Sequence, residues 1–373
     1  MRLRDACFRR FGPNNFGGTT LGTWLQILCD NRFSIDAPYW PRAAMITLFA
    51  AFNSVPALIE RLQYGKKIAD SVAEPPIFVL GAWRSGTTHL HNLLSLDTRF
   101  AYPAQFDVSC PSTCINSEGL GTRIFDWVVP KQRPQDAVKM GAREAQEEDF
   151  AICALSGQTN LLAWAFPRNA AFYMRYMTLT GLSAVELKYW TDTYTHFLKK
   201  LTYKYRRPLV LKTPANTGRI RTLLELFPDA KFVTIHRHPY DVFLSLTHTL
   251  RTAGPWWQLQ KRDYNDGKAI ANELVEQLRS LFNSYFAQRS LIPPSNLCEV
   301  AFADLERDPV GQLRKIYDAL QLPTFETVEP SISSYMNALS NYKKNEFGPL
   351  SPELKLRLQQ EWSQCFAEWG YAV

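Results

Sequence analysis

The stretch FVLGAWRSGTTHLHNLL, residues 78–94, joins a short apolar run to a loop suited to binding an anion. Four residues separate Gly81 from Gly86 within it, and the apolar spacing after Gly86 predicts a helix. In such a loop the backbone N–H groups converge on one point, and the start of the helix adds partial positive charge. We therefore predict a phosphate- or sulfate-binding loop whose contacts are made by Arg84, Ser85, Gly86, Thr87 and Thr88.

The position of the positive charge narrows the choice of ligand. A P-loop for nucleoside triphosphates has a lysine directly after the second glycine, where it contacts the β- and γ-phosphates. Here Thr87 occupies that place, and the charge belongs to Arg84, near the middle of the loop. This arrangement favours a single phosphate joined to a sulfuryl group. A P-loop kinase or NTPase remains the alternative, which magnesium-dependent ATP turnover would support.

A second anion motif follows another predicted strand. The run KFVTIH, residues 231–236, predicts a strand, and Arg237 comes directly after it. Pro239 suits the first turn of the next helix, which would carry Ser245. Because arginine is planar and permanently charged, Arg237 and Ser245 are suited to bind one phosphate together. The competing interpretation is a surface ion pair between Arg237 and Asp241.

These motifs resemble those of sulfotransferases that use 3′-phosphoadenosine 5′-phosphosulfate (PAPS). WRSGTT at 83–88 is similar to the 5′-phosphosulfate loop of that family, and LKTPANTGRIRTLLELFPDAKFVTIHRHPYDVFLSL at 211–246 is similar to its 3′-phosphate segment. FADLERDP, LQLP, YKKNEF and the final EWGYAV also resemble that family, so the likeness extends from about residue 70 to the end. It implies transfer of a sulfuryl group from PAPS to a hydroxyl or amine, with no metal required.

The resemblance also implies roles for single residues. Arg84 and its loop would bind the 5′-phosphate, and Arg237 with Ser245 would bind the 3′-phosphate. Lys212, at the end of the predicted strand RPLVLKT, would lie beside the sulfuryl or bridging oxygen. Further contacts to the 3′-phosphate are expected from two lysines of the C-terminal segment, Lys343 and Lys344.

The general base is less clearly indicated. Asn216 stands where similar sequences usually have a histidine, and an amide cannot accept a proton at neutral pH. The acidic run REAQEEDFAI offers carboxylates instead, and we favour Glu147 with Glu148 as the second choice. If this run is helical, Glu144 and Glu148 share one face. Asn216 would then orient the acceptor or the transferring group, and a PAPS-binding protein without catalytic activity remains a further alternative.

The elements that must position these residues alternate between strand and helix. Strands are predicted at 77–81, 207–213, 231–236 and 297–302, each followed by a helical pattern. Short apolar strands separated by helices predict an α/β fold with a P-loop-like central parallel β-sheet flanked by helices. Residues 1–74 would form a helical N-terminal segment packed on a single domain at 75–373, in which 107–206 form a helical insertion on the substrate side.

Composition and net charge indicate which kinds of partner the chain can bind. The 373-residue chain carries a net charge of +7 without any block of like charge, which favours small anionic ligands over nucleic acid. The basic N-terminus lacks the apolar run of a signal peptide, so we expect a cytoplasmic protein. Aromatic segments suggest an apolar small-molecule, lipid or glycan acceptor, and the oligomeric state is not indicated.

The sequence leaves open whether one apolar run contacts a membrane. Residues 45–59 are mostly apolar but contain Asn53, Ser54 and Pro56, and they fall short of the roughly 20 residues of a spanning helix. We expect this segment to pack in the core. The alternative is peripheral contact, with this helix and the preceding APYWP resting on a membrane surface.

Overall fold

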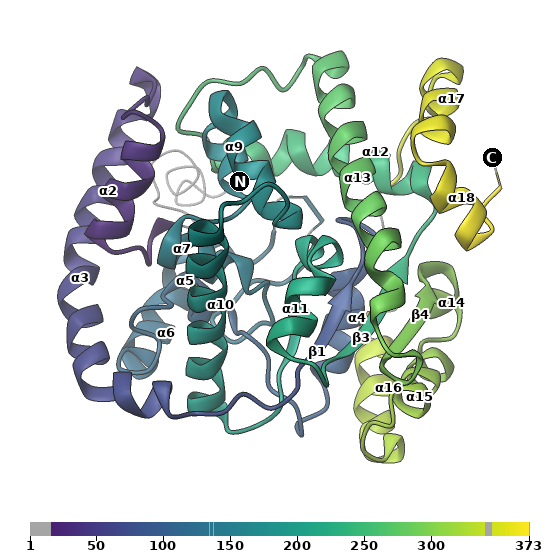
Figure 1. Cartoon of the computed structure of the whole chain (residues 1–373), viewed down its shortest axis with the longest axis horizontal. Helices are drawn as coiled ribbons and strands as arrows, with labels where there is room; N and C mark the ends of the chain where they lie inside the picture. Colours follow the sequence, from purple (N-terminus) through teal and green to yellow (C-terminus); the bar gives the residue numbers. More distant parts are fainter. Residues whose placement is uncertain (1–15, 134, 137, 340–344, 373) are drawn as a thin grey trace. The chain divides into compact units, whose positions relative to one another are not determined.

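The computed structural model in Figure 1 describes residues 16–133, 135–136, 138–339 and 345–372. Contacts divide the chain into two compact units. The first consists of residues 1–73, 102–206 and 250–265, and the second of residues 74–101, 207–249 and 266–373. Each unit is described by itself.

The second unit contains a parallel four-stranded sheet in the order β2-β1-β3-β4. Its strands are β1 (Ile77–Leu80), β2 (Val210–Lys212), β3 (Lys231–His236) and β4 (Leu297–Ala301). Phe78 of β1 pairs with Leu211 of β2 on one side and with Phe232 of β3 on the other. The predicted parallel α/β fold is therefore confirmed, with each strand within two or three residues of its expected bounds.

Helices cover both faces of this sheet. Alternate residues point to one face, so Val79, Val233 and Val300 form one apolar cluster with α4 (Thr87–Leu94), α15 (Pro309–Ala319) and α16 (Glu329–Ala338). On the opposite face, the Tyr285 hydroxyl of α13 (Gly267–Gln288) bonds to the Thr234 hydroxyl at 3.1 Å. The sheet is thus the middle layer of an α/β/α arrangement.

The strand order places a switch point at the end of β1. The chain passes from β1 to β2 on one side, and β3 then pairs with the other side of β1. In open parallel sheets, ligands bind beyond the carboxyl ends of the strands at such a point. The remaining elements of this unit are η4 (Pro214–Gly218), α11 (Ile220–Leu226), α12 (Pro239–Ala253, whose last four residues belong to the first unit), η6 (Arg289–Leu291), η7 (Pro294–Asn296), α14 (Phe302–Arg307), η8 (Phe325–Thr327), α17 (Pro352–Glu361) and α18 (Ser363–Trp369).

The first unit is helical in the part of the chain described here. Its elements are α2 (Leu21–Asp30), η2 (Ala37–Tyr39), α3 (Trp40–Ala69), α5 (Gln105–Ser109), α6 (Glu118–Val128), α7 (Asp149–Ser156), α8 (Leu162–Ala165), η3 (Pro167–Asn169), α9 (Ala170–Thr178), α10 (Ala184–Tyr205) and η5 (Gly254–Trp256). Its apolar core includes Trp24, Ile46 and Phe166, all fully buried. This core ties α2, α3 and α8 together.

The long helix α3 corrects one expectation from the sequence. Residues 45–59 were expected to pack in the core, and this is wrong for one side of the helix: Leu48, Phe52 and Val55 are exposed. The residues lie inside a continuous helix of 30 residues with Pro56 in its interior. Proline removes one helical hydrogen bond. Ile46, Ala50 and Ile68 are buried along one side of α3, and this packing outweighs the missing bond. The same helix therefore runs well past both ends of the apolar run.

Candidate functional site

The loop after β1 is shaped by two glycines with positive φ. Gly81 has φ +142° and Gly86 φ +102°. A Cβ on Gly81 would lie 2.4 Å from the Ile235 carbonyl oxygen, and one on Gly86 would lie 2.3 Å from the Phe302 ring. Neither position therefore accepts a side chain without displacing its neighbours. The loop leads directly into α4 at Thr87, so the N-terminus of this helix lies at the end of the loop.

Arg84 lies in the middle of this loop in a left-handed conformation, with φ 71°. Left-handed backbone is uncommon outside glycine and asparagine, and it is often found at functional sites. The Arg84 Nε–H donates to the Ser245 hydroxyl at 2.9 Å. Ser245 belongs to α12, which follows β3, so this bond joins the two anion motifs predicted from the sequence.

A buried lysine lies beside the same loop. Lys212 ends β2 with 1% exposure, and its Nζ donates to the Thr88 hydroxyl at 3.4 Å. The neighbouring His91 is fully buried and bonds through Nε2 to the Val210 carbonyl at 3.2 Å. Burial lowers the pKa of His91 to about 3, and the charge of Lys212 acts in the same direction. His91 is therefore neutral at physiological pH, and Lys212 supplies the cation.

The segment after β2 bonds to the predicted anion-binding loop, residues 81–88 (the anion loop), through a residue that the sequence analysis did not single out. The Gly81 N–H donates to the Thr217 hydroxyl at 2.7 Å. Its neighbour Asn216 is buried, and the Asn216 side-chain oxygen accepts a bond from Arg219 at 3.2 Å. Arg219 is a second buried cation near this edge. The one signal in the sequence for the role of Thr217 is its position shortly after a predicted strand.

Arg237 reaches the loop indirectly. Its Nε–H bonds to Asp241 at 3.3 Å, so the ion pair considered from the sequence is present. The Arg237 guanidinium also lies over the Phe302 ring, 4.8 Å from its centre. The same ring would contact a Cβ on Gly86. Arg237 therefore shares an aromatic neighbour with the anion loop, at the carboxyl ends of β1 and β3.

The proposed carboxylates belong to the first unit. Residues 144–148 are not helical and α7 begins at Asp149, so the condition under which Glu144 and Glu148 would share a helix face is not met. Backbone bonds to a distant segment explain this, since the Gln105 N–H donates to the Glu144 carbonyl and the Gln146 N–H to the Pro103 carbonyl.

The carboxylates of this segment have different surroundings. Glu148 is fully buried and accepts the Tyr194 hydroxyl at 3.0 Å, whereas Glu147 is half-buried. Glu144 forms an ion pair with Lys139 at 2.6 Å near the surface. Lys343 and Lys344 lie outside the described residues.

The second unit thus gathers most of the predicted nucleotide contacts. The loop contains Arg84, Ser85, Gly86, Thr87 and Thr88. Ser245 bonds to Arg84 of this loop, and Lys212 bonds to Thr88. Asn216 directly precedes Thr217, whose hydroxyl accepts the N–H of Gly81. Two residues that the sequence did not single out also contact the loop: Thr217 bonds to Gly81, and the Phe302 ring packs against Gly86. Four cations, Arg84, Lys212, Arg219 and Arg237, belong to this unit, and such a concentration of positive charge favours an anionic ligand.

Comparisons with known proteins show the family of this chain. The profile of a sulfotransferase family matches residues 75–327. The chain is 31% identical over 355 residues to the omega-hydroxy-beta-dihydromenaquinone-9 sulfotransferases Stf3 of Mycobacterium bovis and Mycobacterium tuberculosis, covering 95% of this chain and 90% of each relative.

Two crystal structures share the fold. Sulfotransferase STF9 of Mycobacterium avium has a TM-score of 0.67 at 18% identity, over 94% of this chain and 96% of that one. Sulfotransferase STF1 of Mycobacterium tuberculosis has a TM-score of 0.62 at 18% identity, over 97% of both chains.

Proposed function

Because the chain belongs to the sulfotransferase family, we propose that it transfers a sulfuryl group from PAPS to a hydroxyl, or an amine, of an apolar, lipid-like acceptor. The observation that carries this proposal is the bond between Arg84 and Ser245, which links the anion loop to α12. PAPS carries charged groups at both its 5′ and 3′ positions, so it needs two anion sites within the length of one nucleotide. The linked motifs supply such a pair.

The nucleotide would be held as follows. The 5′-phosphate occupies the loop between Gly81 and Thr88, where Arg84 and the backbone N–H groups meet it. The 3′-phosphate lies by Ser245 and Arg237, and Arg237 exchanges part of its contact with Asp241 for the phosphate. Lys343 and Lys344 stay a prediction as additional ligands of this phosphate. The two positive-φ glycines support the proposal, because they allow the tight loop conformation that other residues rarely adopt.

The chemical step needs an in-line displacement at sulfur. The acceptor oxygen forms a new bond to sulfur, the bond from sulfur to the 5′-phosphate oxygen breaks, and its electron pair leaves with 3′,5′-ADP. Negative charge grows on the bridging oxygen, and the Lys212 ammonium is the group we assign to stabilise it. Its burial beside Thr88 supports that role, because a cation acts more strongly where water is excluded.

The acceptor proton goes to a carboxylate in this mechanism. We assign the general base to Glu147, since it is only half-buried, whereas Glu148 is fully buried and engaged by Tyr194. Asn216 contributes an amide that orients the transferring group, and it cannot serve as base. These roles predict that Glu147 affects turnover far more than nucleotide affinity.

A lipid-like acceptor is supported by the relatives. The Stf3 proteins are named for a hydroxylated dihydromenaquinone, which joins a hydroxyl group to a long apolar chain. We propose a comparable hydroxylated apolar molecule as the acceptor. Turnover of a small phenol or a glycan instead would replace this acceptor class. A cytoplasmic location, expected from the sequence, also stays a prediction.

The test is turnover of labelled PAPS with a panel of hydroxylated isoprenoids, phenols and glycans in the presence of a chelator. We expect release of 3′,5′-ADP together with a labelled, organic-soluble sulfate ester. A protein that binds 3′,5′-ADP but turns over no acceptor would instead support the inactive binding protein. Kinase or NTPase activity, which family membership does not favour, would require turnover of ATP with magnesium.

A further inference from the structure

The outward side of α3 is covered with large apolar side chains. Leu48, Phe52 and Leu62 expose 66%, 74% and 77% of their surface. Other exposed apolar residues of this helix are Trp40, Met45, Phe49, Val55, Leu58 and Ile59. Leu48, Phe52, Val55, Ile59 and Leu62 follow each other at spacings of three and four residues, so they share one helix face. The whole helix, at 30 residues, is about 45 Å long, and this face runs along about half of it.

The opposite side of α3 is anchored in the first unit. The buried Arg42 donates to the Gln258 carbonyl at 2.7 Å, and the buried Glu60 pairs with Lys200 of α10. Trp24 of α2 donates to the Thr47 hydroxyl at 2.9 Å. The segment Ala37–Ala69 is long and apolar enough to cross a membrane by length and composition alone. Its buried charged groups and bonds to α2 and α10 instead hold it as a surface helix of a folded unit.

The apolar surface continues onto α6. Glu60 accepts the N–H groups of Ile115 and Asn116, just before α6, and the Asn116 side chain donates to Gln63 of α3 at 2.7 Å. On α6, the residues Leu120, Ile124 and Trp127 are exposed and share one helix face. Two neighbouring helices thus present apolar side chains to solvent, which is far more than the scattered single residues of an ordinary surface.

Positive charge borders this face at one end. The sequence from residue 37 to residue 59 contains no aspartate or glutamate, and its only charged residue is the buried Arg42. Exposed Arg61, Lys66 and Lys67 follow directly. A second copy of the chain would bring the same cations to an interface, whereas a bilayer with anionic head groups neutralises them.

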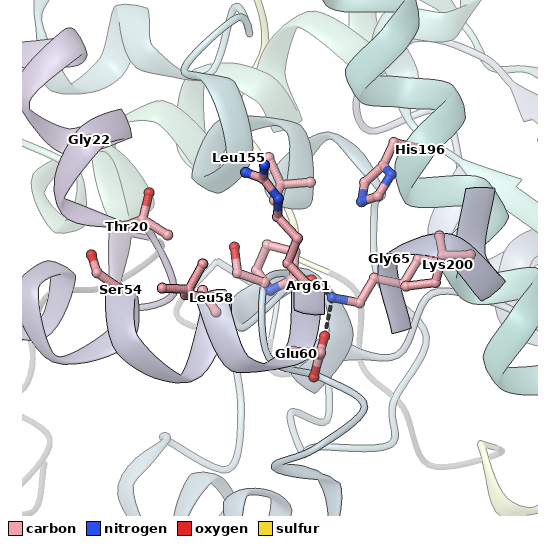
Figure 2. A pocket seen from close by; sticks show the side chains of 14 residues that line it. Thr20, Gly22, Ser54, Leu58, Glu60, Arg61, Gly65, Leu155, His196 and Lys200 are labelled. Atoms are coloured by element: carbon pink, nitrogen blue, oxygen red, sulfur yellow. Dashed lines mark hydrogen bonds and ion pairs between the residues drawn. The ribbon is translucent and has the colours of Figure 1, made fainter. Parts of the chain in front are cut away.

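A cavity beside the apolar face could hold one lipid head group. It has a volume of about 390 Å³ and lies between α2, α3 and α10 (Figure 2). Leu58 and Arg61 of α3 line it together with His196 and Lys200 of α10. Among the described residues, Arg61 has no ion-pair partner, and its side chain extends over this cavity toward Leu155 (Figure 2). The cavity and the apolar face share Leu58, so they are continuous.

We propose that α3 is a membrane-docking helix. Its apolar face enters the boundary between head groups and acyl chains of an anionic bilayer, and Arg61 binds a lipid phosphate at the adjoining cavity. Lys66 and Lys67 contact further head groups. This goes beyond the sulfuryl transfer proposed above and does not depend on which acceptor is used.

The experiment is flotation of the full chain with phosphatidylcholine vesicles, alone or with about one third phosphatidylglycerol. We expect the protein to float with the anionic vesicles and to release at high salt. The double variant Leu48→Glu, Phe52→Glu should lose flotation, and each of Arg61→Ala, Lys66→Ser and Lys67→Ser should lower partitioning about fivefold. The control Leu356→Glu changes an exposed leucine of α17 and should float like the unaltered protein.

Three outcomes would overturn the proposal. The first is the absence of flotation with either vesicle. The second is a dimer, seen by light scattering, that the Leu48→Glu, Phe52→Glu variant dissociates. The third is protein that stays in the membrane through an alkaline carbonate wash, as a spanning helix would. Binding of 3′,5′-ADP by each variant in solution shows that its fold is intact and keeps this test separate from that of the sulfotransferase activity.

Discussion

Arg84 donates a hydrogen bond from Nε to the hydroxyl of Ser245 at 2.9 Å, across 161 residues of sequence. The first residue lies in the loop after β1, and the second lies in the helix after β3. Because β1 and β3 are neighbouring parallel strands, their carboxyl ends meet at one edge. The bond brings two separate sequence motifs into contact, as the proposed nucleotide site requires.

Replacing either Arg84 or Ser245 should weaken nucleotide binding, and the replacement of Arg84 should weaken it more. Ser245→Ala removes one hydroxyl, and we expect about a tenfold loss of affinity for 3′,5′-ADP. Arg84→Lys keeps the charge but loses the planar set of N–H donors, so a loss of about a hundredfold is expected. Calorimetric titration measures both. Arg251→Lys, an exposed change at the end of α12, is the control, and equal affinities for all three variants would contradict the assignment.

The anion loop depends on glycine at position 86. Gly86→Ala places a Cβ against Phe302 in a backbone conformation that alanine rarely adopts, so we expect unfolding to become easier by about 2–4 kcal/mol. Urea denaturation at neutral pH measures this change. Gly22→Ala, in helix α2 with open space around the new Cβ, should stabilise slightly. Equal stability of the two variants would show that the loop is less tightly packed than described.

Glu147 and Glu148 should behave differently when changed to glutamine. We expect Glu147→Gln to lower kcat about a hundredfold or more and to leave 3′,5′-ADP affinity unchanged. Glu148→Gln alters a buried carboxylate bonded to Tyr194, so its main effect should be a lower free energy of unfolding. Steady-state turnover and urea denaturation separate the two. If neither variant changes turnover, the base is not in this segment.

The buried His91 predicts a dependence of stability on pH. Its folded-state pKa is lowered to about 3, mainly by burial, while an unfolded histidine titrates near its model value of 6.5. Between these values the unfolded chain binds more protons, so stability falls as the pH drops from 7 toward 5, by up to about 1.4 kcal/mol per pH unit. The unaltered protein should therefore lose more stability over this range than His91→Gln. The same loss in both proteins would mean that other groups govern it.

The sequence predicted the sheet and the loop after β1 well, and the conformation of the acidic run less well. Strand ends, glycine spacing and the arginine at position 84 are local signals, and they lead to the α/β fold and the loop directly. Thr217 and Phe302 were missed because their roles depend on contacts with Gly81 and Gly86, distant in sequence. The acidic run was ambiguous because backbone bonds to Gln105 and Pro103, not local propensity, keep residues 144–148 out of a helix. In α3, tertiary packing overrode the signal of Pro56.

Titration with 3′,5′-ADP and 5′-AMP in the presence of EDTA tests the central claim most directly, because the two ligands differ only in the 3′-phosphate. We predict that 3′,5′-ADP binds about thirtyfold or more tightly than 5′-AMP, as expected from charge-assisted bonds to that phosphate. Arg237→Ala should remove most of this difference and leave the affinity for 5′-AMP unchanged. Equal affinities of the unaltered protein for both ligands, or a preference for ATP that requires magnesium, would contradict the account.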